Sequence, residues 1–166
     1  MRIFSIAIID NQKREEILAN CKDKEERKRT ESIIKPILRG KDIKRYTYNW
    51  AGLWLVFIPW HFPLHKDETI QGASKKAEGE FKKQYPVVYN HLLHFKDKLE
   101  KRNKAETGIR YEWYALQRCA NTYYPEFEKE KVVWKRIGSM IRFGHDKNKM
   151  YCLDSNVIMT GKRFKD

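Results

Sequence analysis

Residues 33–46 read IIKPILRGKDIKRY, and the elements on either side can be placed outward from this stretch. Pro36 biases the residue before it towards extended backbone, so a helix that precedes it ends there. The charged stretch 23–34 is therefore predicted as a helix. Residues 38–42 are predicted as a turn, in which Gly40 is free to take a positive φ.

Towards the N-terminus, residues 3–9 are mostly apolar and predict a short buried strand or an extended entry segment. A further helix is predicted over residues 12–20. Asp10 and Asn11 precede it, and such side chains cap helices because they accept hydrogen bonds from the free N–H groups of the first turn.

Towards the C-terminus, two strands are predicted at 43–49 and 53–58, joined by a hairpin at 49–52. The second is continuously apolar, which is typical of a central strand. Helices are predicted at 74–84 and from Pro86 to about residue 102, where apolar residues recur at helical spacing.

The last third of the chain predicts one helical turn at 113–118 and then short antiparallel strands. The strands are expected at 132–137, 140–143, 151–153 and 157–159, with turns at 138, 144–146 and 154–156. The predicted class is α+β, with helices and small antiparallel sheets.

Composition sets the broad class of the protein. At 166 residues the chain is long enough to bury a core, and 22 aromatic residues argue against disorder. Three cysteines without a C-x-x-C spacing suggest a reducing, cytoplasmic compartment. The longest apolar run, 50–60, is far shorter than the ~20 residues of a membrane helix, so no membrane partner is expected.

The net charge of +13 is concentrated in three stretches. Residues 35–45 carry +4, residues 96–110 carry +3, and residues 131–149 carry +5, whereas the charged stretch 11–31 is nearly balanced at +1. Lys and Arg gathered in this way indicate a polyanion partner, and nucleic acid fits better than membrane lipid because no strongly amphipathic basic helix is present.

Catalytic motifs are absent from the sequence. It contains neither G-x-x-x-x-G-K-[ST] nor G-x-G-x-x-G, and no Asn-Pro-Pro-Tyr. The pairs His61/His65 and His91/His94 lack a cysteine or carboxylate constellation, so no metal site is predicted. The E-x-K matches at 26–28 and 80–82 lie in charged helical stretches and do not indicate a nuclease. No catalytic residue and no cofactor are therefore predicted.

The stretch 33–46 resembles the opening block of the TaqI-like C-terminal specificity domain, which is found in type IIG restriction–modification enzymes and adenine-specific DNA methyltransferases. Shorter matches follow in the order of that family, at 85–102, 113–118, 130–133 and 151–159. The start of the chain does not reproduce the usual G-x-N-x-A-F junction.

The resemblance implies a division into residues 1–34, a helical junction from a methyltransferase domain, and residues 35–166, a DNA target-recognition domain. It implies sequence-specific binding of double-stranded DNA, non-catalytic in itself. The resemblance also implies a methyltransferase or endonuclease domain as a partner, in cis or in trans. S-adenosylmethionine and Mg²⁺ are expected only in that domain. The chain is then an excised recognition domain or the product of a split or truncated gene.

The candidate DNA-binding residues are basic or amide side chains. Arg39, Lys41, Lys44 and Arg45 surround a glycine turn, where backbone can approach phosphate, and Arg118 is either a phosphate contact or a buried ion-pair partner. They are Lys35, Arg39, Lys41, Lys44, Arg45, Arg110, Arg118, Arg136, Arg142, Lys147 and Asn148. A structural role is the alternative for Arg39, Lys41, Lys44 and Arg45, since Asp42 can pair with Arg39 or Arg45. Trp113 and Tyr114 are predicted as packing residues, with base contact as the alternative.

Two other functions stay open at this point. One is a small metal-dependent nuclease. The other is a protein-interaction domain that docks on a separate methyltransferase subunit.

Overall fold

The computed structural model describes residues 6–102, 104–117, 124–138, 140 and 142–161. The chain forms two compact units, one made of Met1–Ile34 and Val56–Asn121 and the other of Lys35–Leu55 and Thr122–Asp166. The predicted boundary at residue 34 coincides with the first passage of the chain between the units. Residues 56–121, however, lie in the same unit as the N-terminal segment.

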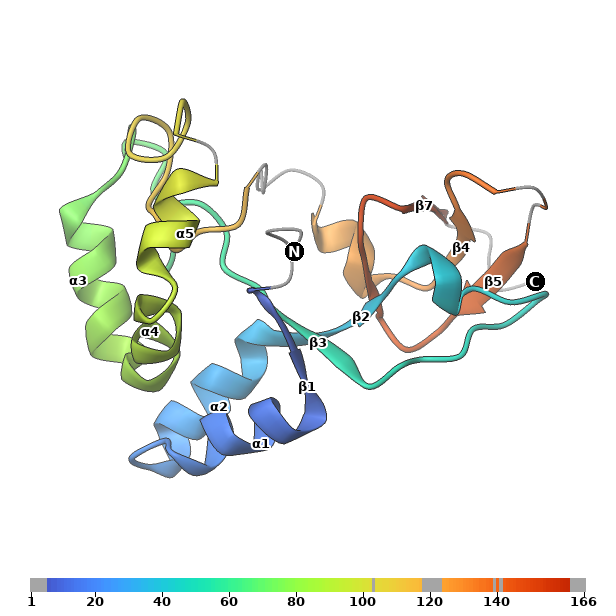
Figure 1. Ribbon diagram of the computed structural model, residues 1–166, viewed down its shortest axis with the longest axis horizontal. Coiled ribbons are helices and arrows are strands. Elements are labelled where there is room, and N and C mark those ends of the chain that lie inside the picture. The colour runs from blue at the N-terminus through green and yellow to red at the C-terminus, as the bar shows by residue number, and fades with distance from the viewer. Residues whose placement is uncertain (1–5, 103, 118–123, 139, 141, 162–166) are drawn as a thin grey trace. The chain divides into compact units, whose positions relative to one another are not determined.

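The first unit contains the α-helices of the described chain and one short strand (Figure 1). Its elements are β1 (Ile8–Asp10), α1 (Asn11–Ala19), α2 (Lys24–Ile33), α3 (Lys75–Gln84), α4 (Pro86–Leu93) and α5 (Lys96–Lys101). The last residue of β3 (Leu53–Val56) also belongs to it, and the Val56 N–H donates to the Ala7 carbonyl beside β1 at 2.8 Å.

Side-chain caps explain where these helices begin. The Asp10 carboxylate accepts from the Lys13 N–H at 2.8 Å, which confirms it as the cap of α1. Asp23 caps α2 in the same way, and the Ser74 hydroxyl caps α3. Pro86 occupies the first turn of α4, where its missing N–H has no cost.

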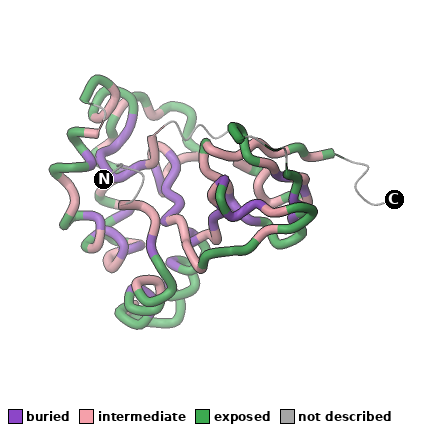
Figure 2. Tube along the Cα trace, turned by 45° about the vertical axis from the view of Figure 1, so that its right-hand side comes forward, coloured by how far each residue is buried: buried purple, intermediate pink, exposed green. Residues whose placement is uncertain are grey.

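Aromatic side chains build the core of the first unit. Phe81 on α3 is fully buried, and its ring centroid lies 4.6 Å from that of Tyr114 and 5.7 Å from that of Phe62. Trp113 is buried beside Tyr89 at a centroid distance of 5.8 Å. The prediction that Trp113 and Tyr114 serve packing is confirmed, and Figure 2 shows the buried segments of this unit in purple.

Two predicted helical segments differ from the structure. The helix expected from Pro86 to about residue 102 is broken into α4 and α5, because the Phe95 N–H bonds to the Leu92 carbonyl three residues back and tightens the turn. Residues 113–117 form turns and no helix. The Leu116 N–H donates to the Ile58 carbonyl at 2.8 Å, which takes this backbone out of a helical pattern.

The second unit contains short strands and two 3-10 turns. Its elements are β2 (Ile34–Leu38), η2 (Gly40–Asp42), most of β3, η3 (Tyr124–Glu128), β4 (Lys131–Lys135), β5 (Phe143–Asp146), β6 (Tyr151–Cys152) and β7 (Asn156–Thr160). Ile34, the first residue of β2, lies in the first unit. The α+β class is confirmed.

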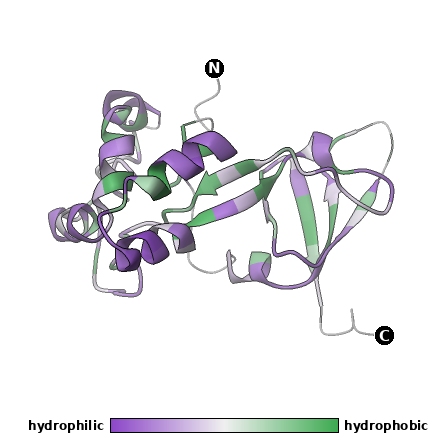
Figure 3. Cartoon of the chain, turned by 90° about the horizontal axis from the view of Figure 1, so that it is seen from below, coloured by the Kyte–Doolittle hydropathy of each residue, from purple (hydrophilic) through white to green (hydrophobic). Residues whose placement is uncertain are grey.

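A three-stranded antiparallel sheet of order β5-β4-β7 organises this unit. Val133 in the central strand pairs with Gly144 of β5 and Ile158 of β7. Its fully buried side chain packs in a cluster with Leu38, Ile43 and Met150. Figure 3 shows hydrophobic residues along the strands and hydrophilic residues in much of the surrounding loop structure.

Several strand predictions for this unit were wrong. Residues 43–49 form only isolated bridges, because Tyr46 takes a φ of 65° that no regular strand allows, so the expected hairpin at 49–52 does not form either. The strand expected at 140–143 is shifted to 143–146, which turns the predicted 144–146 turn into strand. The predicted strand at 151–153 is not antiparallel: β6 pairs in parallel with β2.

The reason for glycine at position 40 also differs from the prediction. Gly40 is not among the glycines with positive φ; a Cβ there would lie 3.1 Å from Lys135 Cγ and 3.3 Å from the Ser155 carbonyl oxygen. The η2 turn therefore needs glycine at position 40 because its backbone lies close to β4 and to the turn between β6 and β7.

Gly144→Ala tests the packing of β5 against the 43–48 segment. A Cβ at this position would lie 2.8 Å from the Thr47 carbonyl oxygen, so backbone must shift, and we expect a loss of about 1–3 kcal/mol in the free energy of unfolding. Urea denaturation measures this free energy of unfolding. The control is Gly79→Ala in α3, where a Cβ meets nothing and helix propensity predicts a gain of about 0.5–1 kcal/mol. Equal shifts of the two variants would contradict the close approach.

Candidate nucleic-acid interface

Two of the three basic stretches come together in the second unit. The Tyr46 N–H donates to the Phe143 carbonyl at 2.7 Å, and the Tyr48 hydroxyl donates to the Asp146 carboxylate at 3.2 Å. Residues 46–48 therefore run beside β5. The basic stretches 35–45 and 131–149, which are far apart in sequence, form parts of one unit.

The second unit is the more basic of the two for its size. It holds 15 Lys+Arg against 7 Asp+Glu in 66 residues, a net charge of +8, while the 100 residues of the first unit carry the remaining +5. Long-range attraction of a polyanion is therefore concentrated on the smaller unit.

The side chain of Arg39 is bonded within the unit and does not point into solvent as a free cation. Its guanidinium makes two bonds to the Asp42 carboxylate, at 3.0 and 2.8 Å, and its N–H donates to the same group. Hydrogen bonding to Asp42 raises the pKa of Arg39 above its ordinary value. The alternative that Asp42 pairs with Arg39 is confirmed, and the pair fixes the η2 turn.

Lys35 also has an internal partner. Its ammonium lies 3.0 Å from the Glu128 carboxylate and 5.6 Å from the centroid of the Tyr151 ring. Burial by itself raises the pKa of Glu128, but the bond from the Tyr151 hydroxyl and the pair with Lys35 bring that pKa below its ordinary value. Lys35 thus helps to hold η3 against β6.

Other basic side chains of this unit face solvent. Among the described residues, no carboxylate lies within ion-pair distance of the exposed residues Lys135 and Lys149. The same holds for four further exposed residues that were predicted to bind DNA, which we name the exposed basic group: Lys41, Arg45, Arg136 and Arg142. Lys44 is half-buried, and its ammonium donates to the Lys41 carbonyl at 3.3 Å. The exposed basic group is free to contact phosphates or base edges.

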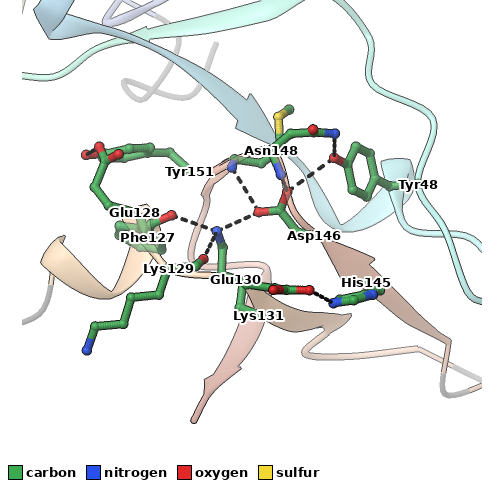
Figure 4. Close-up of polar contacts among 11 residues, drawn as sticks. Tyr48, Phe127, Glu128, Lys129, Glu130, Lys131, His145, Asp146, Asn148 and Tyr151 are labelled. Carbon is green, nitrogen blue, oxygen red and sulfur yellow. Dashed lines mark hydrogen bonds and ion pairs between the residues drawn. The ribbon is translucent and has the colours of Figure 1, made fainter. Parts of the chain in front are cut away.

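A buried ion pair lies at the centre of the loops that carry these residues. The side chains of Lys131 and Asp146 are both fully buried and lie 2.5 Å apart. The Lys131 ammonium also donates to the carbonyls of Phe127 and Lys129, at 2.7 and 3.4 Å. Figure 4 shows the ammonium of Lys131 pointing into this ring of oxygens.

The Asp146 carboxylate in turn organises the turn that leaves β5. It accepts from the backbone N–H groups of Asn148, at 2.8 Å, and Met150, at 2.9 Å. The Asn148 side chain donates to the Tyr48 hydroxyl at 2.8 Å, so this predicted DNA-binding residue has an internal bond (Figure 4). Burial raises the pKa of Tyr48 above its ordinary value, and its hydroxyl donates to Asp146.

Lys147 projects from the same turn. Its side chain is 70% exposed, and its ammonium lies 3.9 Å from the Glu130 carboxylate, whose main partner is His145 at 2.7 Å. An exposed pair at that distance contributes little, so Lys147 stays available to another anion.

The third basic stretch, 96–110, lies in the first unit. Its residue Arg102 is internal: the guanidinium donates to the carbonyls of Trp113 and Ala115, and burial lowers its pKa. Arg110 is exposed, 3.9 Å from Glu106. Arg118 lies outside the described residues.

Sequence reasoning missed the residues that hold this site in shape. Lys131 and Asp146 were counted only as charges, and Lys135, whose stem passes over Gly40, was not singled out. No signal in the sequence marked the pair, because Lys131 ends the charged run 128–131 and Asp146 precedes the polar residues 147–149 in a predicted turn.

Within the described part of the chain, no group of three His, Cys, Asp or Glu residues could hold a metal ion. Cys21 and Cys152 are unbonded, and burial raises the pKa of Cys152 to about 11. The search for membrane spans finds no helix of sufficient length and hydrophobicity among the described residues.

Comparison with known proteins gives one clear result. Residues 35–165 match the family model of the TaqI-like C-terminal specificity domain. No curated protein matches the chain.

Lys131→Met tests the buried ion pair. It leaves the Asp146 carboxylate buried without its cation, and we expect a loss of about 3–5 kcal/mol in the free energy of unfolding, measured by denaturant titration. The matched control is Lys129→Met. Lys129 makes a pair with Glu126 at the surface, and its removal is expected to cost less than about 1 kcal/mol. The interpretation is wrong when the two variants are equally stable.

Proposed function

Because the chain belongs to the family of TaqI-like C-terminal specificity domains, we propose that it reads a specific sequence in double-stranded DNA for a type IIG restriction–modification enzyme or an N6-adenine DNA methyltransferase. Membership in this family already implies DNA target recognition in restriction–modification systems. The type of enzyme, the duplex target and the residues in contact with it are the proposed part.

The observation that carries the proposal is the meeting of two basic stretches in one unit. Internal partners hold Lys35, Arg39 and Lys131, and these residues shape the loops. The exposed basic group stands on the same loops without a carboxylate partner among the described residues. A scaffold with unpaired cations on its loops can position a duplex through phosphate contacts.

We divide the predicted DNA-binding residues by what they can reach. Lys41, Lys44, Arg45 and Lys147 lie around the η2 turn and the turn after β5, and we assign them to phosphates. Arg136 and Arg142 flank the loop between β4 and β5, and their planar guanidinium groups suit the two acceptors of guanine in the major groove. Arg110 and Arg118 are proposed separately as DNA contacts of the first unit.

The chemistry belongs to other domains in this proposal. A methyltransferase or endonuclease domain, in cis or in trans, supplies methyl transfer and cleavage together with S-adenosylmethionine and Mg²⁺. The present chain supplies only orientation on the target.

Binding of labelled duplex DNA measured against salt concentration tests the proposal. With about four to eight phosphate contacts, log K is expected to fall with log salt at a slope of about −4 to −7. Arg142→Ala is expected to weaken binding, with a slope smaller by about 1 for a phosphate contact, or a loss of ~1–3 kcal/mol and relaxed specificity for a base contact.

Lys24→Ala is the matched control, because Lys24 is exposed on the charge-balanced helix α2. Equal effects of the two substitutions, or a slope near zero, would overturn the proposal. Incubation of plasmid with the protein and Mg²⁺ or Mn²⁺ adds a second check, since sustained cleavage would favour a nuclease instead.

A further inference from the structure

Three aromatic side chains on the second unit have no role in its core. We propose that Tyr46, Trp134 and Phe143, named here the aromatic edge, form a stacking surface for unpaired bases of a DNA strand. This goes beyond the reading of duplex DNA and rests on that proposal only in taking DNA as the partner.

Strand register places two of these rings on the outer face of the sheet. Trp134 pairs directly with Phe143 across the antiparallel β4–β5 ladder, so both side chains point to the same side. The neighbouring residue Val133 points to the opposite side and is fully buried in the core. The outer face therefore carries Trp134 and Phe143.

The exposure of these rings is large for aromatic side chains. Phe143 is 46% exposed, and its ring centroid lies 5.6 Å from that of half-buried Trp134. The next pair on this face, Val132 and His145, is followed across the sheet by Met159, which is 51% exposed. Exposed aromatic rings of this kind suit the face of a nucleobase.

Tyr46 lies beside β5, where its backbone forms a bridge with Gly144. It is 74% exposed, so its ring gains little from packing, and yet its backbone takes a φ of 65° that is unfavourable for a residue other than glycine. The N–H of Tyr46 is fixed by the bond to the Phe143 carbonyl at 2.7 Å. A strained backbone that holds an exposed ring in place points to a binding role.

Positive charge accompanies the aromatic edge. The guanidinium of Arg45 lies 5.2 Å from the centroid of the Tyr46 ring, and Arg142 directly precedes Phe143. Both arginines are exposed and belong to the exposed basic group, within a unit of net charge +8. Rings that offer stacking and cations that offer phosphate contact are together the chemistry of single-strand binding.

The bases must be unpaired, for a geometric reason. In an intact duplex each base stacks on its neighbours, and the grooves present only base edges to a protein. The faces of the aromatic edge can stack only on a base whose own face is free. A locally opened or single-stranded segment of DNA supplies such bases.

The experiment compares two single strands in fluorescence anisotropy titrations with the intact protein. One is a labelled ten-nucleotide thymidine strand, and the other has the same length and the same phosphates but abasic sugars. We expect the thymidine strand to bind at least about five-fold more tightly, since stacking of one base on one ring contributes ~1 kcal/mol or more. Equal affinities for the two strands overturn the proposal. The same result is expected if the aromatic edge contacts another protein instead of DNA bases.

Variants then locate the effect. Tyr46→Asn removes the ring but keeps a residue that tolerates positive φ, and it is expected to reduce the preference for thymidine over abasic strands about five-fold. Tyr46→Phe keeps the ring and is expected to retain the preference. The control Ile109→Asn changes an exposed apolar residue of the first unit, 69% exposed, and is expected to have no effect. Loss of the preference in all three variants contradicts the assignment.

The two proposals fail separately. A wild-type protein that binds duplex with the expected salt slope, but does not distinguish thymidine from abasic strands, contradicts only the stacking surface. A protein that prefers thymidine strands and shows no salt-dependent duplex binding contradicts the duplex proposal and supports the stacking surface.

Discussion

The second unit depends on one buried carboxylate. Asp146 is fully buried and accepts from four donors: the Lys131 ammonium, the Tyr48 hydroxyl and the N–H groups of Asn148 and Met150. A charge taken out of water is tolerated only when it is paired and its remaining lone pairs are satisfied. These donors come from separate segments of the unit, so one interaction fixes β4, the segment after η2 and the turn after β5 together.

This requirement divides the basic residues into two kinds. Lys35, Arg39 and Lys131 have carboxylate partners inside the unit and shape its loops. The exposed basic group stands on those loops and faces solvent. Net charge alone treats all of them as equal, although the exposed residues can contact a nucleic acid without first breaking an internal ion pair.

Local signals in the sequence predicted what local physics controls. Asp10 acts through a hydrogen bond within a single helical turn, so α1 begins where capping places it. Pro86 at the start of α4 is another case of this kind. Where the backbone bonds to a distant segment, the same reasoning was wrong. The 43–49 stretch has strand-like residues, but Tyr46 bonds to Phe143 at positive φ instead of entering a sheet.

The sequence by itself determined the α+β class, most helix boundaries, the basic character of the partner surface and the family block at 33–46. Tertiary structure alone decided that 35–45 and 131–149 share one unit, which cations are internal and which are exposed, and that the ring of Tyr46 is held in solvent at the edge of β5. The physical reason is the distance along the chain over which each interaction acts. Capping and amphipathic spacing act over a few residues, whereas the pairing of Lys131 with Asp146 and the bond from Tyr46 to Phe143 depend on contacts that form only when remote segments fold together.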